Sequence, residues 1–205
     1  MADKGIHRTG VLTGGGDCPG LNAVIRGVVK ACIGSYGMEC IGIEDGYEGL
    51  IARRVGPLGW EQVSGILTIG GTILGTSNRA NPFKWAVKKA GDSLEFADVS
   101  DEVVEYIREL GLDCIVAIGG DGSMSIAKSL AAKGVHIVGV PKTIDNDIWG
   151  TDVTFGFDSA VSIATEALDR IHTTAMSHHR VMVVEVWAGM RDGLHWPPAS
   201  EAAGT

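Results

Sequence analysis

Short apolar runs alternate along the chain with stretches whose apolar residues recur at helical spacing. Residues 8–13 and 39–43 have the apolar character of short buried strands. The stretch between them carries apolar residues three and four positions apart, which predicts one face of a helix. These residues are Leu21, Val24, Ile25, Val28, Val29, Cys32 and Ile33. We expect Asp17 to cap this helix and Pro19 to lie in its first turn, so that the chain opens as a β-α-β unit.

The same alternation continues to residue 186. Residues 114–118 form a continuous apolar run, as in strands that are buried on both faces of a parallel sheet. Further strands are expected at 135–140 and 181–186. Helices are expected at 101–110, after the loop 119–123 through Ile126 and Leu130, and at 158–172. This order predicts an α/β fold with a parallel sheet, in which ligands gather at the carboxyl ends of the strands.

Composition and net charge limit which kinds of binding partner and which cellular compartment we expect for this protein. The 205 residues are 45% apolar and 20% charged, which is enough apolar material for a sizeable core. A net charge of −8 argues against a nucleic-acid partner, and no apolar run is long enough to span a membrane. The N-terminus lacks the apolar segment of a signal peptide, and the four cysteines lack metal-ligand spacing. We therefore expect a cytoplasmic protein with free thiols.

Two glycine-rich loops follow predicted strands. Residues 14–20 (GGGDCPG) can bring backbone N–H groups and the positive end of the next helix to a phosphate, or can be a tight turn that needs glycine. In residues 119–123 (GGDGS), Asp121 can hold Mg²⁺ beside a polyphosphate, or can cap the following helix.

A third loop carries two carboxylates after a strand. In residues 141–147 (PKTIDND), Asp145 and Asp147 flank Asn146. Such a carboxylate can accept the proton of an attacking hydroxyl in phosphoryl transfer, and the alternative is an Asx turn. Arg79 and Arg180 can each contact a phosphate, although solvated or surface-paired arginines are the ordinary alternative.

These three loops, in this order and spacing, resemble the signature loops of the 6-phosphofructokinase family. Residues 155–160 (FGFDSA) and 177–186 (SHHRVMVVEV) match the family as well, so the resemblance covers roughly residues 8–186. The resemblance implies a three-layer, phosphofructokinase-like parallel sandwich, incomplete in this chain. It also implies transfer of the γ-phosphate of Mg·ATP to the 1-hydroxyl of fructose 6-phosphate in glycolysis, by a homo-oligomer when the protein is intact.

The resemblance also assigns roles to single residues. It implies that Asp145 is the base, with Thr143 and Asp147 beside it, and that Asp121 binds Mg²⁺. Arg180 would contact the sugar phosphate of a neighbouring subunit. The residues implied to contact the nucleotide are Gly15, Gly16, Arg79, Gly120, Asp121, Gly122 and Ser123.

Two positions in the sequence, Gly122 and Lys142, bear on whether the phosphoryl donor is ATP or pyrophosphate. Relatives that use pyrophosphate carry aspartate where this chain has Gly122, so the glycine favours ATP. Lys142, in contrast, is typical of the pyrophosphate users, where many ATP enzymes have glycine. We expect ATP to be the donor, with pyrophosphate as the alternative.

Residues 187–205 depart from the family pattern. The family continues after residue 186 with MGRHAGWIAL, whereas this chain has WAGMRDGLHW. Codons that encode the observed residues, read one base earlier, can encode the family motif. We therefore hypothesise a one-base loss near the codon for Val186, which sequencing of the gene would test. The alternative is a natural, divergent short paralogue.

The resemblance divides the chain into three segments. Residues 1–140 correspond to the N-terminal part of a nucleotide-binding domain, 141–186 to the start of a sugar-phosphate domain, and 187–205 to a tail outside the family. We expect the isolated chain to expose apolar surface, to be poorly soluble and to show no kinase turnover. A catalytically dead nucleotide-binding or regulatory subunit is the alternative. A diacylglycerol- or NAD-kinase relative would explain only the second loop.

Overall fold

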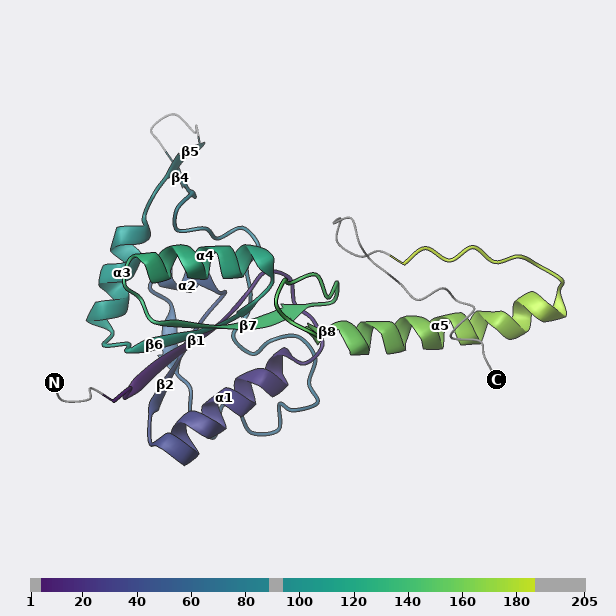
Figure 1. Cartoon of the computed structure of the whole chain (residues 1–205), viewed down its shortest axis with the longest axis horizontal. Helices are drawn as coiled ribbons and strands as arrows, with labels where there is room; N and C mark the ends of the chain where they lie inside the picture. Colours follow the sequence, from purple (N-terminus) through teal and green to yellow (C-terminus); the bar gives the residue numbers. More distant parts are fainter. Residues whose placement is uncertain (1–4, 89–93, 187–205) are drawn as a thin grey trace.

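A six-stranded sheet forms the centre of the computed structural model, which describes residues 5–88 and 94–186 (Figure 1). The strand order is β3-β2-β1-β6-β7-β8, and all neighbours are parallel except β2 and β3. The strands are β1 (Arg8–Gly14), β2 (Glu39–Ile43), β3 (Val55–Pro57), β6 (Cys114–Gly119), β7 (Ile137–Thr143) and β8 (Phe155–Gly156). The expected α/β fold with a mostly parallel sheet is confirmed.

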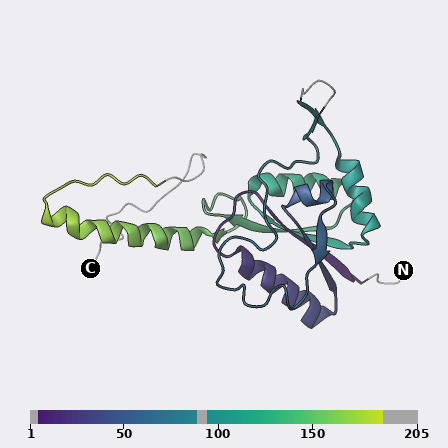
Figure 2. The same ribbon diagram turned by 180° about the vertical axis from the view of Figure 1, so that it is seen from behind.

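Helices cover both faces of this sheet, which gives three layers (Figures 1 and 2). The helices are α1 (Leu21–Tyr36), α2 (Tyr47–Ile51), α3 (Ser100–Glu109), α4 (Asp121–Ala132) and α5 (Phe157–Ser177). Successive residues of β1 point to opposite faces, so Val11 packs in the core under α1 while Leu12 packs in the core under α2, α3 and α4. A hairpin of β4 (Trp85–Lys88) and β5 (Leu94–Ala97) projects from the sheet region.

Helix α5 extends away from the sheet (Figure 1). None of its residues is buried, although it carries apolar side chains at helical spacing. We call the described residues of 5–156 the sheet body, and residues 157–186 the helical arm. The expectation that the chain exposes apolar surface is confirmed on this arm, where Ile163 is 63% and Met176 64% exposed.

Residues 181–186 do not form the strand that their apolar pattern predicts. They carry no strand assignment, and Val181 and Val183 are each 93% exposed. A strand needs a hydrogen-bonded neighbouring strand. In the part of the chain that the structure describes, residues 181–186 run back alongside α5 and not beside the sheet (Figure 1). The apolar pattern of residues 181–186 is typical of a strand, but a strand forms only where a second strand pairs with it.

The start of α1 also differs from the prediction. Gly20 is the N-cap residue, its φ of 95° lies in the left-handed region, and no side chain hydrogen-bonds at this cap. Asp17 is therefore not the cap, and Pro19 lies before the helix rather than in its first turn. Glycine is favoured at this position because a Cβ would strain a backbone with positive φ.

Two loop boundaries move as well. Strand β7 continues through Thr143, with Pro141 paired to Gly119, so the third loop begins only at Ile144. Helix α4 begins at Asp121, with Gly120 as its N-cap, so the second loop is a single residue. Asp121 is thus the first helical residue rather than the cap. No helix in the described residues is both long and apolar enough to cross a membrane.

Candidate active site

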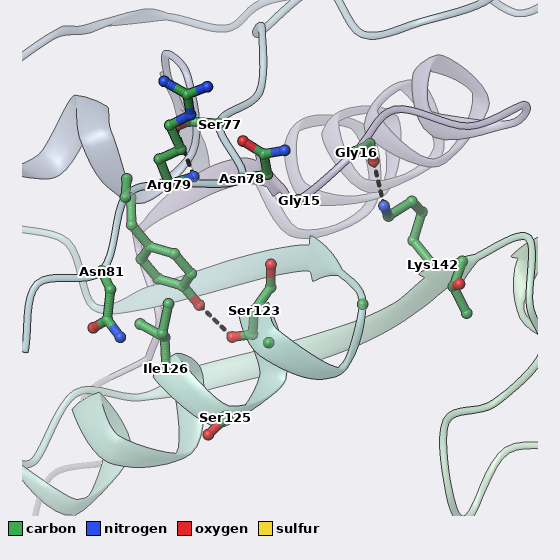
Figure 3. Close-up of a pocket in the computed structure, with 15 residues that line it drawn as sticks. Gly15, Gly16, Ser77, Asn78, Arg79, Asn81, Ser123, Ser125, Ile126 and Lys142 are labelled. Atoms are coloured by element: carbon green, nitrogen blue, oxygen red, sulfur yellow. Dashed lines mark hydrogen bonds between the residues drawn. The ribbon is translucent and has the colours of Figure 1, made fainter. Parts of the chain in front are cut away.

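The carboxyl ends of three neighbouring strands meet at one pocket. Gly14 at the end of β1 pairs with Gly119 at the end of β6, which pairs with Pro141 in β7. The loops after β1 and β6, together with the last residues of β7, line a pocket of about 490 Å³, within the usual range for small-ligand sites. Residues from the predicted loops line it (Figure 3): Gly15, Gly16, Gly120, Gly122, Ser123, Lys142 and Thr143.

Close packing at the start of α4 explains two of the glycines. Ser123 is buried in the first turn of the helix and lies between the ends of β1 and β6. A Cβ on Gly14 or on Gly119 would come within 2.6 Å of the Ser123 Oγ. A Cβ on Gly122, in contrast, would meet nothing within 4 Å. The first two glycines therefore let the helix approach the sheet, whereas Gly122 leaves open space at the pocket.

The segment 72–79 holds the first glycine loop in place. Thr76 Oγ1 donates hydrogen bonds to the carbonyl oxygens of Gly15 (2.5 Å) and Thr13 (3.2 Å). The N–H of Gly15 donates to the carbonyl of Ser77 at 3.1 Å. Gly15, with a φ of 83°, therefore brings the backbone close to the pocket, but its N–H is already bonded within the protein. The loop is thus a tight turn that also lines the pocket, and phosphate binding by its backbone stays a prediction.

The same segment carries Arg79 to the pocket wall. The side chain of Arg79 is exposed, and its backbone N–H lies 3.4 Å from Ser77 Oγ (Figure 3). Asn22, in the first turn of α1, supports the start of this segment. Its buried amide donates to the carbonyl of Ile69 and accepts the N–H of Ile73. The sequence offered no signal for this clamp, because the two partners lie about fifty positions away.

Lys142 is a buried cation that joins two of the loops. Its side chain is 5% exposed, and its Nζ donates to the carbonyl of Gly16 (Figure 3). Burial lowers the pKa of the Lys142 ammonium, while Cys18, Asp17 and Asp145 act in the opposite direction. Lys142 therefore ties β7 to the first glycine loop and adds positive charge beside the pocket.

Tyr47, at the start of α2, also lines the pocket. Sequence reasoning missed it. The ring is 2% exposed, and its hydroxyl donates to the carbonyl of Ser123 at 2.9 Å (Figure 3). Burial raises the pKa of the Tyr47 phenol, so the group stays a hydrogen-bond donor. Tyr47 thus holds the first turn of α4 against the sheet body.

The third loop is organised by its own polar side chains. Thr143 Oγ1 accepts the N–H of Asp145 at 3.2 Å and lies 3.3 Å from the Asp145 carboxylate. Asn146, with a φ of 51°, accepts the N–H of Thr154, whose hydroxyl donates to the carbonyl of Thr143. Asp145 is half-buried two residues beyond the pocket-lining Thr143, and it interacts electrostatically with Lys142.

Four of the sequence-predicted residues lie outside the lining of the pocket: Asp145, described above, and three others. Asp121 is exposed beside Gly120, Asp147 is exposed in the third loop, and Arg180 follows the far end of α5. Among the described residues, no three His, Cys, Asp or Glu side chains are arranged to hold a metal ion. The position of Asp121 fits Mg²⁺ that takes its other ligands from phosphate and water.

The fold and the pocket together define an α/β protein with a ligand-sized pocket at a helix N-terminus on the carboxyl edge of its sheet. Comparison with known protein families shows to which class of protein this fold belongs. A model described as "Phosphofructokinase" matches residues 8–193 of the chain. The chain therefore belongs to the phosphofructokinase family.

Individual relatives are similar over most of this chain. It is 53% identical over 193 residues to ATP-dependent 6-phosphofructokinase 3 of Bacteroides thetaiotaomicron, covering 91% of this chain and 56% of that protein. It is 50% identical to a pyrophosphate–fructose 6-phosphate 1-phosphotransferase of Amycolatopsis mediterranei, covering 91% of this chain and 53% of that protein. The chain thus spans about half the length of the curated relatives it matches.

A solved structure confirms the family fold. The phosphofructokinase from Saccharomyces cerevisiae superposes with a TM-score of 0.71 at 34% identity, covering 88% of this chain and 26% of that chain. The expected phosphofructokinase-like architecture is therefore confirmed.

Proposed function

We propose that this chain provides the phosphoryl-donor half of a site that transfers phosphate from ATP to the 1-hydroxyl of fructose 6-phosphate, a step of glycolysis. The observation that carries the proposal is the convergence on one pocket of the glycine loops after β1 and β6 and of the carboxyl end of β7. The names of the relatives agree with it, and they include both an ATP-dependent enzyme and a pyrophosphate-dependent one. Because the chain spans about half of each relative, the activity of the whole protein is proposed rather than assigned.

In the proposed reaction, the residues of the first two loops hold the donor. Gly15, Gly16, Gly120, Gly122 and Ser123 form the floor on which the phosphates of ATP lie, and the N-terminus of α4 points its positive end at them. Arg79, on the opposite wall, places a guanidinium where it can contact phosphate oxygens. Mg²⁺ bound with the nucleotide would be held by Asp121 and would neutralise charge on the β- and γ-phosphates.

Asp145 is the proposed general base. The sugar 1-hydroxyl attacks the γ-phosphorus, its proton passes to the Asp145 carboxylate, and ADP leaves. Thr143 orients this carboxylate through the hydrogen bonds described above. Asp147 lies exposed in the same loop, where it can contact the incoming sugar.

ATP is the proposed donor, because Gly122 leaves space where a larger side chain would stand in the pocket. Pyrophosphate is the second candidate, and the buried Lys142 ammonium at the pocket favours it by adding positive charge for a short, highly charged donor. Arg180 lies beyond the far end of α5, so we propose that it serves the sugar phosphate in a neighbouring subunit of a cytoplasmic homo-oligomer.

Nucleotide binding tests the donor half. Isothermal titration of the 205-residue chain should show binding of Mg·ATP that is stronger than binding of Mg·pyrophosphate. Gly122→Asp should weaken ATP binding about tenfold or more, because the added carboxylate occupies the pocket and repels phosphate. Lys128→Met, which alters an exposed residue of the same helix, is the control. Stronger binding of pyrophosphate would reverse the donor assignment, and binding of neither would refute the site.

The alternative, a catalytically dead nucleotide-binding subunit, is favoured by the exposed apolar arm. A coupled assay for fructose 1,6-bisphosphate separates the two functions. We expect no turnover by the chain alone. If adding the chain to a full-length homologue changes the homologue's rate, the regulatory function gains support. Turnover by the chain alone would show that the donor half is sufficient for catalysis.

A further inference from the structure

Three cysteines gather on one face of the sheet, at the end opposite to the pocket. Cys40 of β2 and Cys114 of β6 both pair with Thr9 of β1, so their side chains leave the same face of the parallel sheet. Both are buried, at 5% and 7% exposure. Cys32 of α1 packs against the core on this face and remains half-buried. The cluster combines two enclosed thiols with one that solvent can reach.

Cys32 and Cys40 pack in the same cluster of side chains between α1 and the sheet. Cys32 raises the pKa of both the Cys40 and the Cys114 thiols, so it lies near both, but only Cys40 shares its packed cluster of side chains. The turn between α1 and β2 holds the two elements together, because the N–H of Met38 donates to the carbonyl of Cys32 at 2.9 Å. The two thiols therefore stay in reach of each other without any rearrangement of the sheet.

We propose that Cys32 and Cys40 are an oxidisable pair that hydrogen peroxide converts into an intramolecular disulfide. Cys32 reacts first because it is the more exposed of the two. Its sulfur attacks one peroxide oxygen, which gives Cys32 sulfenic acid and one water. The sulfur of Cys40 then attacks the Cys32 sulfur, the S–S bond forms and a second water leaves. Two thiols thus lose two electrons, which reduce one peroxide to two waters.

Burial supports this order of events. It raises the pKa of the Cys40 thiol from 9.0 to about 12, so Cys40 is a poor nucleophile toward an oxidant in solution. Packing in one cluster with Cys32 compensates for this low reactivity once the sulfenic acid has formed, because the two side chains do not have to meet by diffusion. The disulfide would close a short loop and fasten the end of α1 to β2, at the edge of the sheet away from α5 (Figure 1).

Peptide mapping provides the test. Trypsin releases residues 31–53 as one peptide that contains both cysteines, because no Lys or Arg lies between 31 and 52. The folded chain is treated with hydrogen peroxide, denatured, alkylated with iodoacetamide and digested. We expect most of this peptide to carry no alkyl group, to be two hydrogen atoms lighter than the dithiol, and to take up two alkyl groups after reduction. Oxidation of Met38 adds an oxygen atom, so its mass is distinct.

Matched variants identify the partners. Cys114→Ser should leave the disulfide unchanged. Cys40→Ser should leave a Cys32 sulfenic acid that dimedone traps, whereas the wild-type chain should give little adduct. A peptide 31–53 that remains doubly alkylated after peroxide treatment would overturn the proposal. So would a disulfide that links this peptide to the one containing Cys114. The wild-type and Cys114→Ser results decide the matter even if Cys40→Ser fails to fold.

Discussion

The sheet body and the helical arm show similar apolar periodicity, but they differ in what surrounds it. In the sheet body, Leu21, Ile25 and Val29 of α1 lie against the strands and are almost completely buried. In the arm, α5 is a longer helix without a single buried residue. Amphipathic periodicity therefore predicts that a helix forms, whereas burial depends on a second surface that the described residues of this chain do not provide for the arm. The site residues follow the same division, because the pocket-lining loops belong to the body.

The largest expected difference between the sheet body and the helical arm is the loss of stability when an apolar side chain is truncated. Leu130→Ala in α4 removes a fully buried side chain and should lower the free energy of unfolding by about 2–5 kcal/mol. Ile163→Ala in α5 is the matched control in the arm and should change it by less than about 0.5 kcal/mol. Urea unfolding followed by circular dichroism measures both. Equal losses would mean that the arm is packed in solution.

The next largest expected effect is on stability and nucleotide binding when a glycine at the pocket is replaced by alanine. Gly119→Ala places a Cβ against Ser123 and should cost about 1–3 kcal/mol of stability, together with a loss of nucleotide binding. Gly122→Ala, three residues later, adds its Cβ in open space inside a helix. It should leave stability unchanged or raise it by up to about 1 kcal/mol. If both variants behave alike, the close approach of α4 to the strand ends is not what requires glycine.

Tyr47→Phe should have a smaller effect. It leaves the buried carbonyl of Ser123 without its phenol donor and should cost about 1 kcal/mol. The first turn of α4 would be held less firmly, so Mg·ATP binding should weaken as well. Tyr36→Phe is the control, since Tyr36 is 72% exposed at the end of α1. Thermal unfolding with and without nucleotide measures both effects, and an unchanged nucleotide-induced shift would remove Tyr47 from the site.

The smallest effect concerns pH. Burial places the folded-state pKa of Lys142 below its unfolded value, so the unfolded chain binds more protons between the two values. The stability contribution of Lys142 therefore rises with pH across that window. Relative to Lys142→Met, the wild-type chain should gain stability as the pH rises toward about 10. Lys128→Met, in an exposed position of α4, is the control. If the stability difference between the wild-type chain and Lys142→Met stays constant with pH, the pKa of Lys142 is not lowered by burial.

Local sequence was sufficient for the longer strands and helices of the sheet body and for the order of the site loops. The apolar runs at β1, β2 and β6 were found nearly to the residue, because buried strands carry a strong local signal. The three polar loops follow from this order, since the ends of parallel strands meet at one edge. The short elements α2, β3, β4, β5 and β8 carry too few residues for such a signal and were missed.

Contacts between distant segments were decided only in three dimensions. Residues 181–186 have the composition of a strand, but they lack a paired strand in the described structure. The clamp of Asn22 on the segment 69–73 and the bond from Tyr47 to Ser123 join residues about fifty or more positions apart. Sequence by itself determined which segments are apolar and where glycine and carboxylates fall between them. The tertiary structure decided which of these groups share a pocket, because hydrogen bonding and burial depend on a partner that local sequence does not specify.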